Sequence, residues 1–418
     1  MLRRLYAVLL WLLTPAVLGF TLWRAWRRPS YRAFWWQRFG LVPRRQDRPL
    51  WIHAVSVGEG IAALPLIHAL QQRHPELPIL VTSTTPTGRA LLRARLGDTV
   101  TQLYLPYDLP GAVARFWRRQ QPRLGLLMET ELWPNLLATA RHQRVPVLLL
   151  NARLSARSLH GYQRFAGLFA PALAGLDLVA AQSPADAERF ALLGAQHVAM
   201  LGQLKLDLEI SPAQRERGRQ WRECFGIRPV WVFASTHGGE EAMAAAILPR
   251  LREAVPSLLL VLIPRHPERG EAIAKLMETA GLRVARRSQG QEPDPQMGVF
   301  LVDTLGEVVD FCAAADVVSM GGSFVPHGGH NPLEPAALGK AILVGPYMDN
   351  FQSLNDDMLS AGAIERCTDE DALLTALRHL LQDPPAALAL GQRAADWFAG
   401  QRGALERSLQ RIQDYVGS

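Results

Sequence analysis

Residues Leu50 to Gly60, LWIHAVSVGEG, carry the pattern from which the fold can be predicted. The six residues Leu50 to Val55 are apolar except for His53, which is typical of a strand buried on both faces of a parallel sheet. Ser56 and Glu59 follow at once with the spacing of a capping box, which marks the start of a helix. A strand leading directly into a helix is the repeating unit of an α/β fold.

The same alternation continues along the chain in two series. The first series has strand-like runs at 79–83, 124–128, 147–150 and 178–181, and the second has them at 230–233, 258–263, 299–302, 317–320 and 342–344. A polar, arginine-rich stretch from Ser211 to Arg222 separates the two, and we place a domain boundary near Leu208 to Glu216. A chain of 418 residues also exceeds what one hydrophobic core usually serves. We therefore predict an α/β protein with two Rossmann-like, doubly wound domains.

Four segments follow from this division. Residues 1–28 are expected to be an N-terminal membrane anchor, 29–208 the first Rossmann-like domain, 209–384 the second, and 385–418 a C-terminal helical segment that could pack back across the cleft. Ligands of such sheets bind at the carboxyl ends of the strands, next to helix N-termini. The active site is therefore expected in a cleft between the two domains.

The N-terminal segment is almost entirely apolar from Leu5 to Trp23, close to the ~20 residues that cross a bilayer. Nine arginines precede the first acidic residue, Asp47, which suits the anionic cytoplasmic leaflet. Tryptophans crowd this end as in an interfacial belt, at positions 11, 23, 26, 35 and 36. We expect a membrane anchor at the cytoplasmic face. A cleaved signal peptide and a buried core helix are the alternatives, and spanning or interfacial placement stays open.

The composition limits the other classes of function. The net charge of +7 would suit nucleic acid, an anionic membrane or a phosphorylated substrate, but the excess lies at the N-terminus and no nucleic-acid motif accompanies it. Nucleic acid is therefore not an expected partner. Cys224, Cys312 and Cys367 have no metal-motif spacing, and we interpret all three as small buried side chains in a reducing compartment.

Three acidic or basic positions of the first domain could carry chemistry. Glu59 either caps its helix or acts as a general base, and the two roles are partly compatible. Glu129 follows the strand 124–128, where a carboxylate is costly unless it is paired or used. Lys205 is either a solvated lysine or a group that reaches phosphate or developing negative charge. The string Gly58-x-Gly60-x-x-Ala63 resembles a dinucleotide fingerprint, but the required acidic residue is missing, so NAD is excluded.

The second domain offers sites for an anion. Arg265 ends a strand and either forms a surface ion pair or binds phosphate with its fork. The string from Thr304 to Glu307 has capping-box spacing and predicts a helix start. A glycine-rich loop precedes Asn331, Pro332 and Glu334, which we expect at the N-cap, N1 and N3 positions of a helix that favours phosphate.

No metal ion is predicted. His327 and His330 lack a third ligand nearby in the sequence, and the one acidic string of the Asp-x-Asp type, at 369–371, is interpreted as a helix start. A metal-free site has to neutralise leaving-group charge with arginine, lysine and helix dipoles, and the chain provides all three.

Taken together, these strings resemble the bacterial 3-deoxy-D-manno-octulosonic acid (Kdo) transferases of lipopolysaccharide synthesis. They run in family order over nearly the whole chain, at 56–59, 85–88, 105–108, 128–135, 151–155, 204–205, 264–267 and 328–334. The resemblance implies a GT-B fold with an acceptor-binding first domain and a nucleotide-sugar-binding second domain. It also implies CMP-Kdo as donor, the lipid A precursor lipid IVA as acceptor, inverting and metal-independent transfer, and no cofactor.

The resemblance further implies residue roles. Glu59 would take the proton of the acceptor hydroxyl, and Glu129 and Lys205 would stabilise the transition state. CMP would be held by Pro264, Arg265, Leu305, Gly306, Glu307, Asn331, Pro332, Leu333 and Glu334. Leu305 departs from the family pattern, where methionine is common, and this affects packing more than chemistry.

Two alternatives belong to other classes. One is a nucleotide-sugar epimerase of the same two-domain architecture, which would need no membrane segment and would act on the donor alone. The other is a non-catalytic, membrane-bound binding module, which would lose nothing when Glu59 is replaced. For the transferase, the expected location is the cytoplasmic face of the bacterial inner membrane, in contact with anionic lipids.

Overall fold

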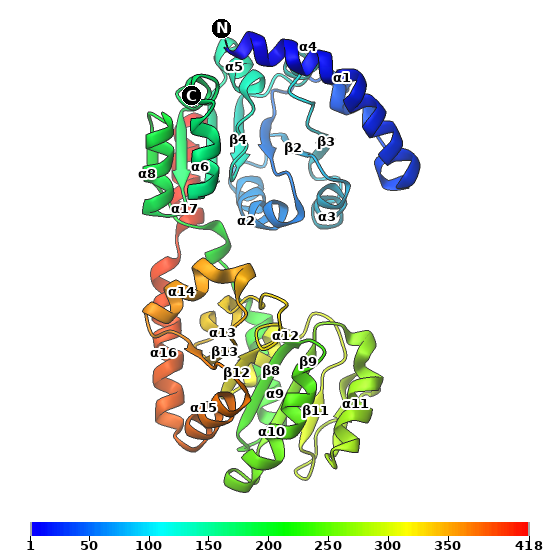
Figure 1. Ribbon diagram of the computed structural model, residues 1–418, viewed down its shortest axis with the longest axis vertical. Helices are drawn as coiled ribbons and strands as arrows, with labels where there is room; N and C mark the ends of the chain where they lie inside the picture. The colour runs from blue at the N-terminus through cyan, green and yellow to red at the C-terminus, as the bar shows by residue number, and fades with distance from the viewer. Residues whose placement is uncertain (1, 417–418) are drawn as a thin grey trace. The chain divides into compact units, whose positions relative to one another are not determined.

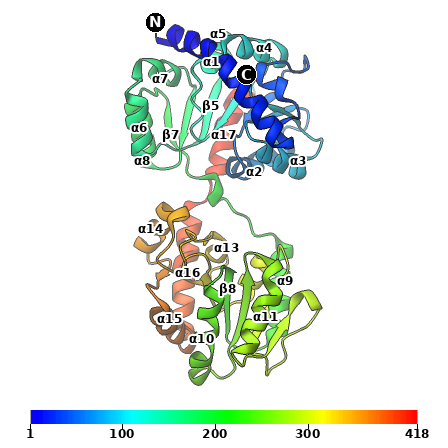
Figure 2. The same cartoon turned by 45° about the vertical axis from the view of Figure 1, so that its right-hand side comes forward.

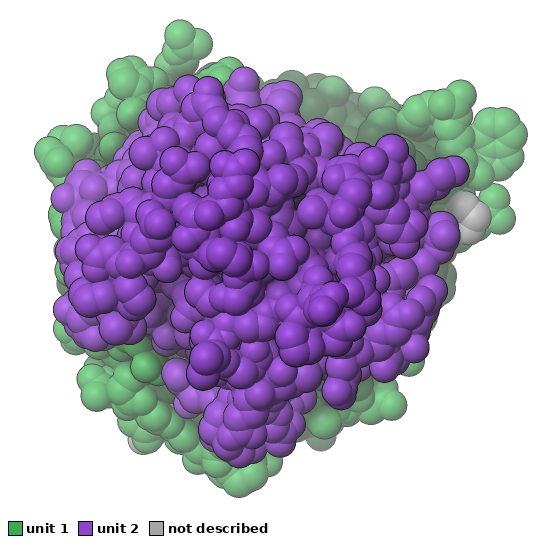
Figure 3. Space-filling model, turned by 90° about the horizontal axis from the view of Figure 1, so that it is seen from below, with its two compact units in different colours: residues 1–207, 402–418 green, residues 208–401 purple. Residues whose placement is uncertain are grey.

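The computed structural model describes residues 2–416 of the chain (Figure 1). It divides into two compact units, shown in separate colours in Figure 3. Unit 1 comprises the residues up to 207 together with those from 402 onwards, and unit 2 comprises residues 208–401. Each unit is a parallel sheet covered by helices, which confirms the predicted α/β fold class.

Unit 1 is built on a seven-stranded parallel sheet in the described residues, with the order β3-β2-β1-β4-β5-β6-β7. Its strands are β1 (Leu50–His53), β2 (Ile79–Ser83), β3 (Thr101–Tyr104), β4 (Leu124–Met128), β5 (Val147–Ala152), β6 (Leu178–Ala181) and β7 (Val198–Met200). The strand order reverses between β1 and β4, so these two neighbours form the topological switch point at which such sheets bind ligands.

The helices of unit 1 cover both faces of this sheet. They are α1 (Leu2–Arg27), α2 (Val57–Arg73), α3 (Pro86–Leu96), α4 (Pro110–Gln120), α5 (Pro134–His142), α6 (Ala156–Gln163), α7 (Ala166–Leu173), α8 (Pro184–Leu193) and α17 (Ala404–Val416), with 3-10 turns at Pro29–Tyr31, Trp35–Phe39 and Leu204–Leu206. Ile52 packs in a core with α2, α3 and α17, whereas Trp51 packs in the core of the opposite face. Alternate residues of β1 therefore serve both cores.

Unit 2 repeats the plan with the strand order β10-β11-β9-β8-β12-β13-β14. Its strands are β8 (Val230–Thr236), β9 (Leu259–Pro264), β10 (Val284–Arg286), β11 (Val299–Leu301), β12 (Val317–Met320), β13 (Ala341–Val344) and β14 (Glu365–Arg366). Its helices are α9 (Pro212–Phe225), α10 (Glu240–Ala254), α11 (Gly270–Thr279), α12 (Val308–Ala314), α13 (Leu333–Ala337), α14 (Gln352–Ser360), α15 (Glu370–Gln382) and α16 (Pro384–Gln401), with 3-10 turns at Pro267–Arg269, Arg287–Gln289 and Asp349–Phe351. Here β8 and β12 flank the switch point.

The arginine-rich stretch at 211–222 is not a linker. It forms α9, whose N-cap Ser211 makes a full capping box with Gln214, and α9 packs against α12. The cysteine prediction was wrong for Cys224, which lies on α9 and is exposed, whereas Cys312 and Cys367 are buried. A helix with one apolar face leaves its remaining positions in water, and Cys224 occupies one of them.

The expected C-terminal helical segment consists of two helices that belong to different units. Helix α16 stays with unit 2, and the chain then returns to unit 1 as α17, which contacts α2. In Figures 1 and 2, α17 is the red helix among the blue and green elements of unit 1. The carboxylate of Asp207 accepts the backbone N–H groups of Gly403 and Leu405. The segment that leaves unit 1 and the segment that returns to it are therefore hydrogen-bonded to each other.

Helix α1 is long and apolar enough to cross a membrane, and only 6% of its most apolar window is buried. Trp11 and Trp26 are each 73% exposed, which rules out the buried core helix as an alternative. The helix nevertheless contacts α5 and α7 of the same unit, and the Thr21 hydroxyl lies 2.9 Å from the Tyr107 hydroxyl. An apolar surface of this extent outside a protein core is typical of contact with lipid.

Candidate active site

Glu59 begins α2 directly after β1, at the switch point of unit 1. Ser56 is the N-cap, and its hydroxyl accepts the Glu59 N–H at 3.4 Å. One carboxylate oxygen accepts the Val55 N–H at 2.8 Å, and the residue is only 8% exposed. Burial raises the pKa of Glu59, the Val55 N–H lowers it in part, and the negative charges of Glu131 and Glu129 raise it further. The predicted capping box is therefore half formed: Ser56 caps the helix, but the Glu59 carboxylate accepts the Val55 N–H in place of the Ser56 N–H.

Glu129 and Lys205 lie next to each other in unit 1. Glu129 follows β4, and its backbone adopts the left-handed region with φ of 59°, which is strained for a residue with a side chain. Its carboxylate is 3.8 Å from the Lys205 ammonium group, and the two side chains are 27% and 42% exposed. The structure therefore brings together a carboxylate and a cation that sequence spacing alone could not pair.

Asn151 positions the turn that carries Lys205. It is the next-to-last residue of β5, its φ is 52°, and its side-chain oxygen accepts the Leu204 N–H at 3.1 Å. Gln182, at the end of β6, donates to the Asn151 carbonyl at 2.8 Å. Neither residue was assigned a role from the sequence, although a polar residue that ends an apolar strand run is the signal that could have identified both.

The residues predicted to bind the nucleotide-sugar donor all lie in unit 2. They differ in whether their polar groups already have partners within the protein. Pro264 ends β9 and is buried, and Arg265 follows it with an exposed side chain. Among residues 2–416, no carboxylate forms an ion pair with Arg265, so the ion-pair alternative is not supported. Its backbone N–H is already bound to the Thr236 carbonyl at 2.9 Å, which leaves the guanidinium as the group available to an anion.

A helix does begin at the string from Thr304 to Glu307, but it begins later than a cap at Thr304 would place it. Helix α12 begins at Val308 with Glu307 as N-cap, because the Glu307 carboxylate is drawn to Arg287 at 2.9 Å and to the Thr304 hydroxyl instead of the helix amides. Burial raises the pKa of Glu307, but these hydrogen bonds outweigh it and the pKa is lowered overall. Leu305 is 81% exposed and Gly306 has a φ of 85°, so this turn offers backbone and an apolar side chain to a ligand.

Asn331 makes the expected capping hydrogen bond, but the helix begins one position later than expected. Helix α13 begins at Leu333 with Pro332 in the N-cap position, and the Asn331 side chain accepts the Leu333 N–H at 3.2 Å. The helix has five residues, so its dipole contributes less than the prediction required. Burial raises the pKa of Glu334, which stands in the first turn.

Three histidines meet at the switch point of unit 2, and sequence reasoning missed one of them. The Nε2 atoms of His237 and His330 are 2.9 Å apart, and the ring of His327 stacks on that of His237 with centroids 4.2 Å apart. Burial lowers the pKa of His237, and burial with the neighbouring cations lowers that of His330 to about 4. His237 and His330 are therefore neutral at pH 7, and their Nε2 atoms are within hydrogen-bonding distance of each other.

In the part of the chain that the structure describes, no group of three or more His, Cys, Asp or Glu side chains is arranged to hold a metal ion. The string at 369–371 begins α15, where the Asp369 carboxylate accepts the Ala372 N–H at 2.9 Å, so its interpretation as a helix start is confirmed.

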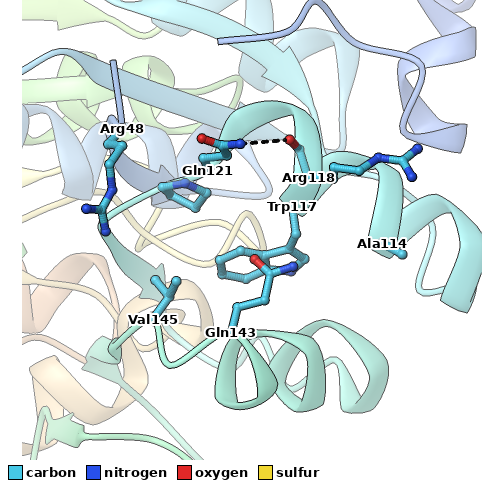
Figure 4. Close-up of a pocket in the computed structure, with 8 residues that line it drawn as sticks. Arg48, Ala114, Trp117, Arg118, Gln121, Gln143 and Val145 are labelled. Carbon is cyan, nitrogen blue, oxygen red and sulfur yellow. Dashed lines mark hydrogen bonds between the residues drawn. The ribbon is translucent and has the colours of Figure 1, made fainter. Parts of the chain in front are cut away.

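A surface hollow of about 530 Å³ in unit 1 is not part of this site (Figure 4). It is lined by Arg48, Trp117, Arg118, Gln143 and Val145, among others. Arg48 and Val145 precede β1 and β5, so the hollow lies at the amino ends of the strands. Glu59 and Glu129 follow the carboxyl ends, at the opposite edge of the same sheet.

Comparison with solved structures shows which known fold this chain shares. A crystal structure of UDP-GlcNAc 2-epimerase from Neisseria meningitidis bound to UDP-GlcNAc is similar with a TM-score of 0.58 and 14% identity, covering 87% of this chain and 99% of that chain. At this identity the likeness concerns the fold alone. Two doubly wound parallel units with polar residues at their switch points define a protein of the GT-B type.

Comparison of sequences shows to which family this chain belongs. Residues 33–208 match the family model described as 3-deoxy-D-manno-octulosonic-acid transferase. The 3-deoxy-D-manno-octulosonic acid transferase of Bordetella pertussis is 43% identical over 99% of this chain and 100% of its own length. That of Haemophilus influenzae is 36% identical over 99% of both chains. The chain belongs to the Kdo transferase family and is a glycosyltransferase, so neither the epimerase nor the non-catalytic module describes it.

Proposed function

We propose that this enzyme transfers Kdo from CMP-Kdo to the lipid A precursor lipid IVA in lipopolysaccharide synthesis. We propose further that the anomeric configuration inverts, that no metal ion takes part, and that the reaction occurs at the cytoplasmic face of the inner membrane. The observation that carries the proposal is Glu59, a buried carboxylate at the switch point of unit 1 with a raised pKa.

The chemical step is a single displacement. A Glu59 oxygen accepts the proton of an acceptor hydroxyl, and the hydroxyl oxygen forms a bond to the anomeric carbon of Kdo. The bond from that carbon to the phosphate oxygen of CMP breaks at the same time, and CMP leaves with the electron pair. Attack opposite to the leaving group inverts the anomeric centre. A raised pKa makes the base stronger at neutral pH than an ordinary glutamate.

Glu129 and Lys205 are proposed to stabilise charge in the transition state. Glycosyl transfer develops positive charge on the sugar ring, which a carboxylate stabilises, and negative charge on the leaving phosphate, which an ammonium group stabilises. The two groups are only 3.8 Å apart, so a single site presents both charges. The left-handed backbone of Glu129 is the kind of strained geometry that is kept where function requires it.

Unit 2 is proposed to hold the donor through the residues at the ends of β8, β9 and β12. Arg265 has no carboxylate partner in residues 2–416 and can take the phosphate with its fork. CMP carries one phosphate group, so one guanidinium and neutral hydrogen-bond donors replace the divalent ion that a diphosphate often requires. Helix α1, with its exposed apolar surface and its arginines, is proposed to keep the enzyme at the membrane where a glycolipid acceptor resides.

The test uses the full-length protein in detergent or vesicles. It is incubated with CMP-Kdo and a tetraacylated lipid A precursor, with and without EDTA, and the lipid product is analysed by mass spectrometry. The proposal predicts an acceptor that gains the mass of Kdo in both samples, and a matched Glu59→Gln preparation that gives no comparable product. Loss of product with EDTA would contradict the metal-free mechanism, and no product under any condition would contradict the substrates.

A further inference from the structure

The burial of α1 follows one face of the helix from its first turns to its last. Its buried and half-buried residues recur with the three- to four-residue spacing of a single helix face. They are Tyr6, Ala7, Leu10, Thr14, Val17, Leu18, Thr21, Arg24 and Ala25. Figures 1 and 2 show the same helix, in dark blue, running along unit 1. The whole length of α1 is therefore docked on unit 1, and its other side faces outward.

The N-terminal end of α1 is held by two segments of unit 1. A Cβ atom added at Gly167, on α7, would lie only 2.6 Å from Cδ1 of Leu2, so the first residue of the helix reaches α7. The Tyr6 hydroxyl is a hydrogen-bond partner of the Asp108 carboxylate. The same carboxylate accepts two backbone N–H groups at the start of α5, at 2.9 and 2.8 Å. This end of α1 is thus tied to α5 and α7.

The C-terminal end of α1 is held by the same unit. Thr21 is 6% exposed, and its hydroxyl lies 2.9 Å from that of Tyr107, the residue before Asp108. The Ala25 carbonyl accepts a hydrogen bond from Arg32 at 2.8 Å, which holds the following chain against the end of the helix. Contacts near both ends of α1 are therefore made with one compact unit.

A helix held in this way cannot also cross a bilayer. With 26 residues, α1 is about 39 Å long, whereas the hydrocarbon core of a bilayer is about 30 Å thick. Crossing would carry Leu2 to the opposite membrane face from Ala25, away from α7 and Asp108. Unit 1 cannot follow, because loops and open sheet edges do not enter the lipid-exposed hydrocarbon region. Pro15, inside the helix, removes one backbone hydrogen bond and permits the bend with which α1 follows unit 1 (Figure 1).

The arginines of this segment lie at both ends of α1. Arg3 and Arg4 stand in its first turn, and Arg24, Arg27 and Arg28 stand in or directly after its last turn. Arginines favour the anionic cytoplasmic face of a membrane, and the positive excess beside a spanning helix ordinarily lies on that side. Positive charge at both ends is therefore the pattern expected of a helix whose two ends lie at the same face.

We propose that α1 does not span the membrane: it lies along unit 1 with both ends at the cytoplasmic face, and its outward apolar side enters one leaflet of an anionic bilayer. The inference rests on the membrane location in the proposed function and adds the orientation of the helix. An interfacial helix buries its apolar face about 5–10 Å deep, at the level where a glycolipid acceptor is reached. The large apolar residues of the outward side are each 46% to 73% exposed, and they lie at positions 5, 8, 9, 11, 12, 13, 20, 22, 23 and 26.

The first test locates the two ends of α1 with a membrane-impermeant maleimide. The full-length protein carries Cys224→Ser, which removes the exposed thiol and leaves the buried Cys312 and Cys367. Arg4→Cys and Arg28→Cys are then introduced singly, and inside-out inner-membrane vesicles are labelled with and without detergent. The proposal predicts that R4C is labelled as fully as R28C in intact vesicles, with no gain on adding detergent. Loss of R4C labelling in intact vesicles, restored by detergent, overturns it, because the N-terminus would then lie across the membrane.

The second test asks whether α1 stays docked when the protein is in a membrane. In the same Cys224→Ser protein, Leu2→Cys is combined with Gly167→Cys on α7 and treated with a short thiol-to-thiol cross-linker. The matched control pairs Leu2→Cys with Gly161→Cys on α6, because a Cβ at Gly161 has no other group within 4 Å. The proposal predicts cross-linking of the 167 pair alone. No cross-linking, or equal cross-linking of both pairs, overturns it.

Neither test uses donor or acceptor, so a failed topology is distinguishable from a failed enzyme function. An enzyme that transfers Kdo with its N-terminus across the membrane overturns the orientation of α1 alone. A full-length protein that does not co-float with anionic vesicles overturns the membrane location and this proposal with it.

Discussion

Glu240 allows a prediction whose size can be worked out from its contacts. This carboxylate is fully buried at the start of α10 and accepts three backbone N–H groups, from His237 at 2.8 Å, Gly322 at 2.8 Å and Phe324 at 3.0 Å. It therefore joins the turn after β8 to the glycine-rich loop after β12. Both segments lie at the switch point where unit 2 is proposed to bind the donor.

The cost of removing the carboxylate follows from the donors left behind. Each buried N–H that loses its partner costs about 1–3 kcal/mol. Glu240→Gln keeps one acceptor oxygen but turns an amide NH2 toward at least one backbone N–H, so we expect a loss of about 2–4 kcal/mol. Glu240→Ala leaves all three backbone N–H groups without an acceptor. Relaxation of the loop and water that enters the cavity should limit the loss of unfolding free energy to about 4–5 kcal/mol.

The assay is thermal unfolding of the full-length protein, with donor affinity measured by CMP titration. For a unit of this size, E240Q should lower the transition of unit 2 by about 4–16 °C. Glu271→Gln is the control, because Glu271 is 85% exposed in its ion pair with Arg286 and should cost less than about 1 kcal/mol. An E240Q protein that melts within about 1 °C of the wild type would refute the reasoning.

Three further predictions use the same protein. Lys205→Ala should lower kcat on the order of 100-fold with little change in KM for the donor, because the ammonium group is assigned to the transition state, and steady-state kinetics with Lys205→Arg as the charge-keeping control checks this. Asp207→Asn should speed hydrogen exchange over 402–416, because the Gly403 and Leu405 N–H groups lose their charged acceptor; unchanged exchange there would contradict the anchoring of α17. Replacing exposed Trp11 and Trp26 by serine should reduce co-flotation with anionic vesicles, whereas replacement of Trp221 on α9 should not.

The central strands could be predicted from the sequence because they are buried on both faces. β2, β4, β6 and β12 have the predicted bounds, and the other interior strands differ by one to three residues at an end. The strands that were missed, β3, β7, β10 and β14, are the edges of the two sheets. Val198–Met200 is apolar but has only three residues and is partly exposed, and Glu365–Arg366 is a pair of exposed charged residues, so neither gives the signal of a buried strand. An edge strand is defined by its neighbour, which local sequence does not reveal.

A site residue could be predicted where its own local sequence gave the signal. It could not be predicted where its role depends on partners that are far away along the chain. Glu59 could be identified from its place after a strand, and its capping partner is three positions away. His53 was part of an apolar run and gave no signal, since its partners Thr82 and Glu131 are 29 and 78 positions away along the chain. Glu307 was assigned to a capping box because the competing Arg287 could not be located from spacing.

The assignment of Glu59 as proton acceptor is tested most directly by Glu59→Gln. With CMP-Kdo and acceptor both saturating, E59Q should lower kcat by about 10²–10⁴-fold, the usual contribution of a general base, while CMP affinity stays that of the wild type because Glu59 belongs to unit 1. A kcat within about tenfold of the wild-type value, in a folded protein that binds CMP normally, would show that another group accepts the proton.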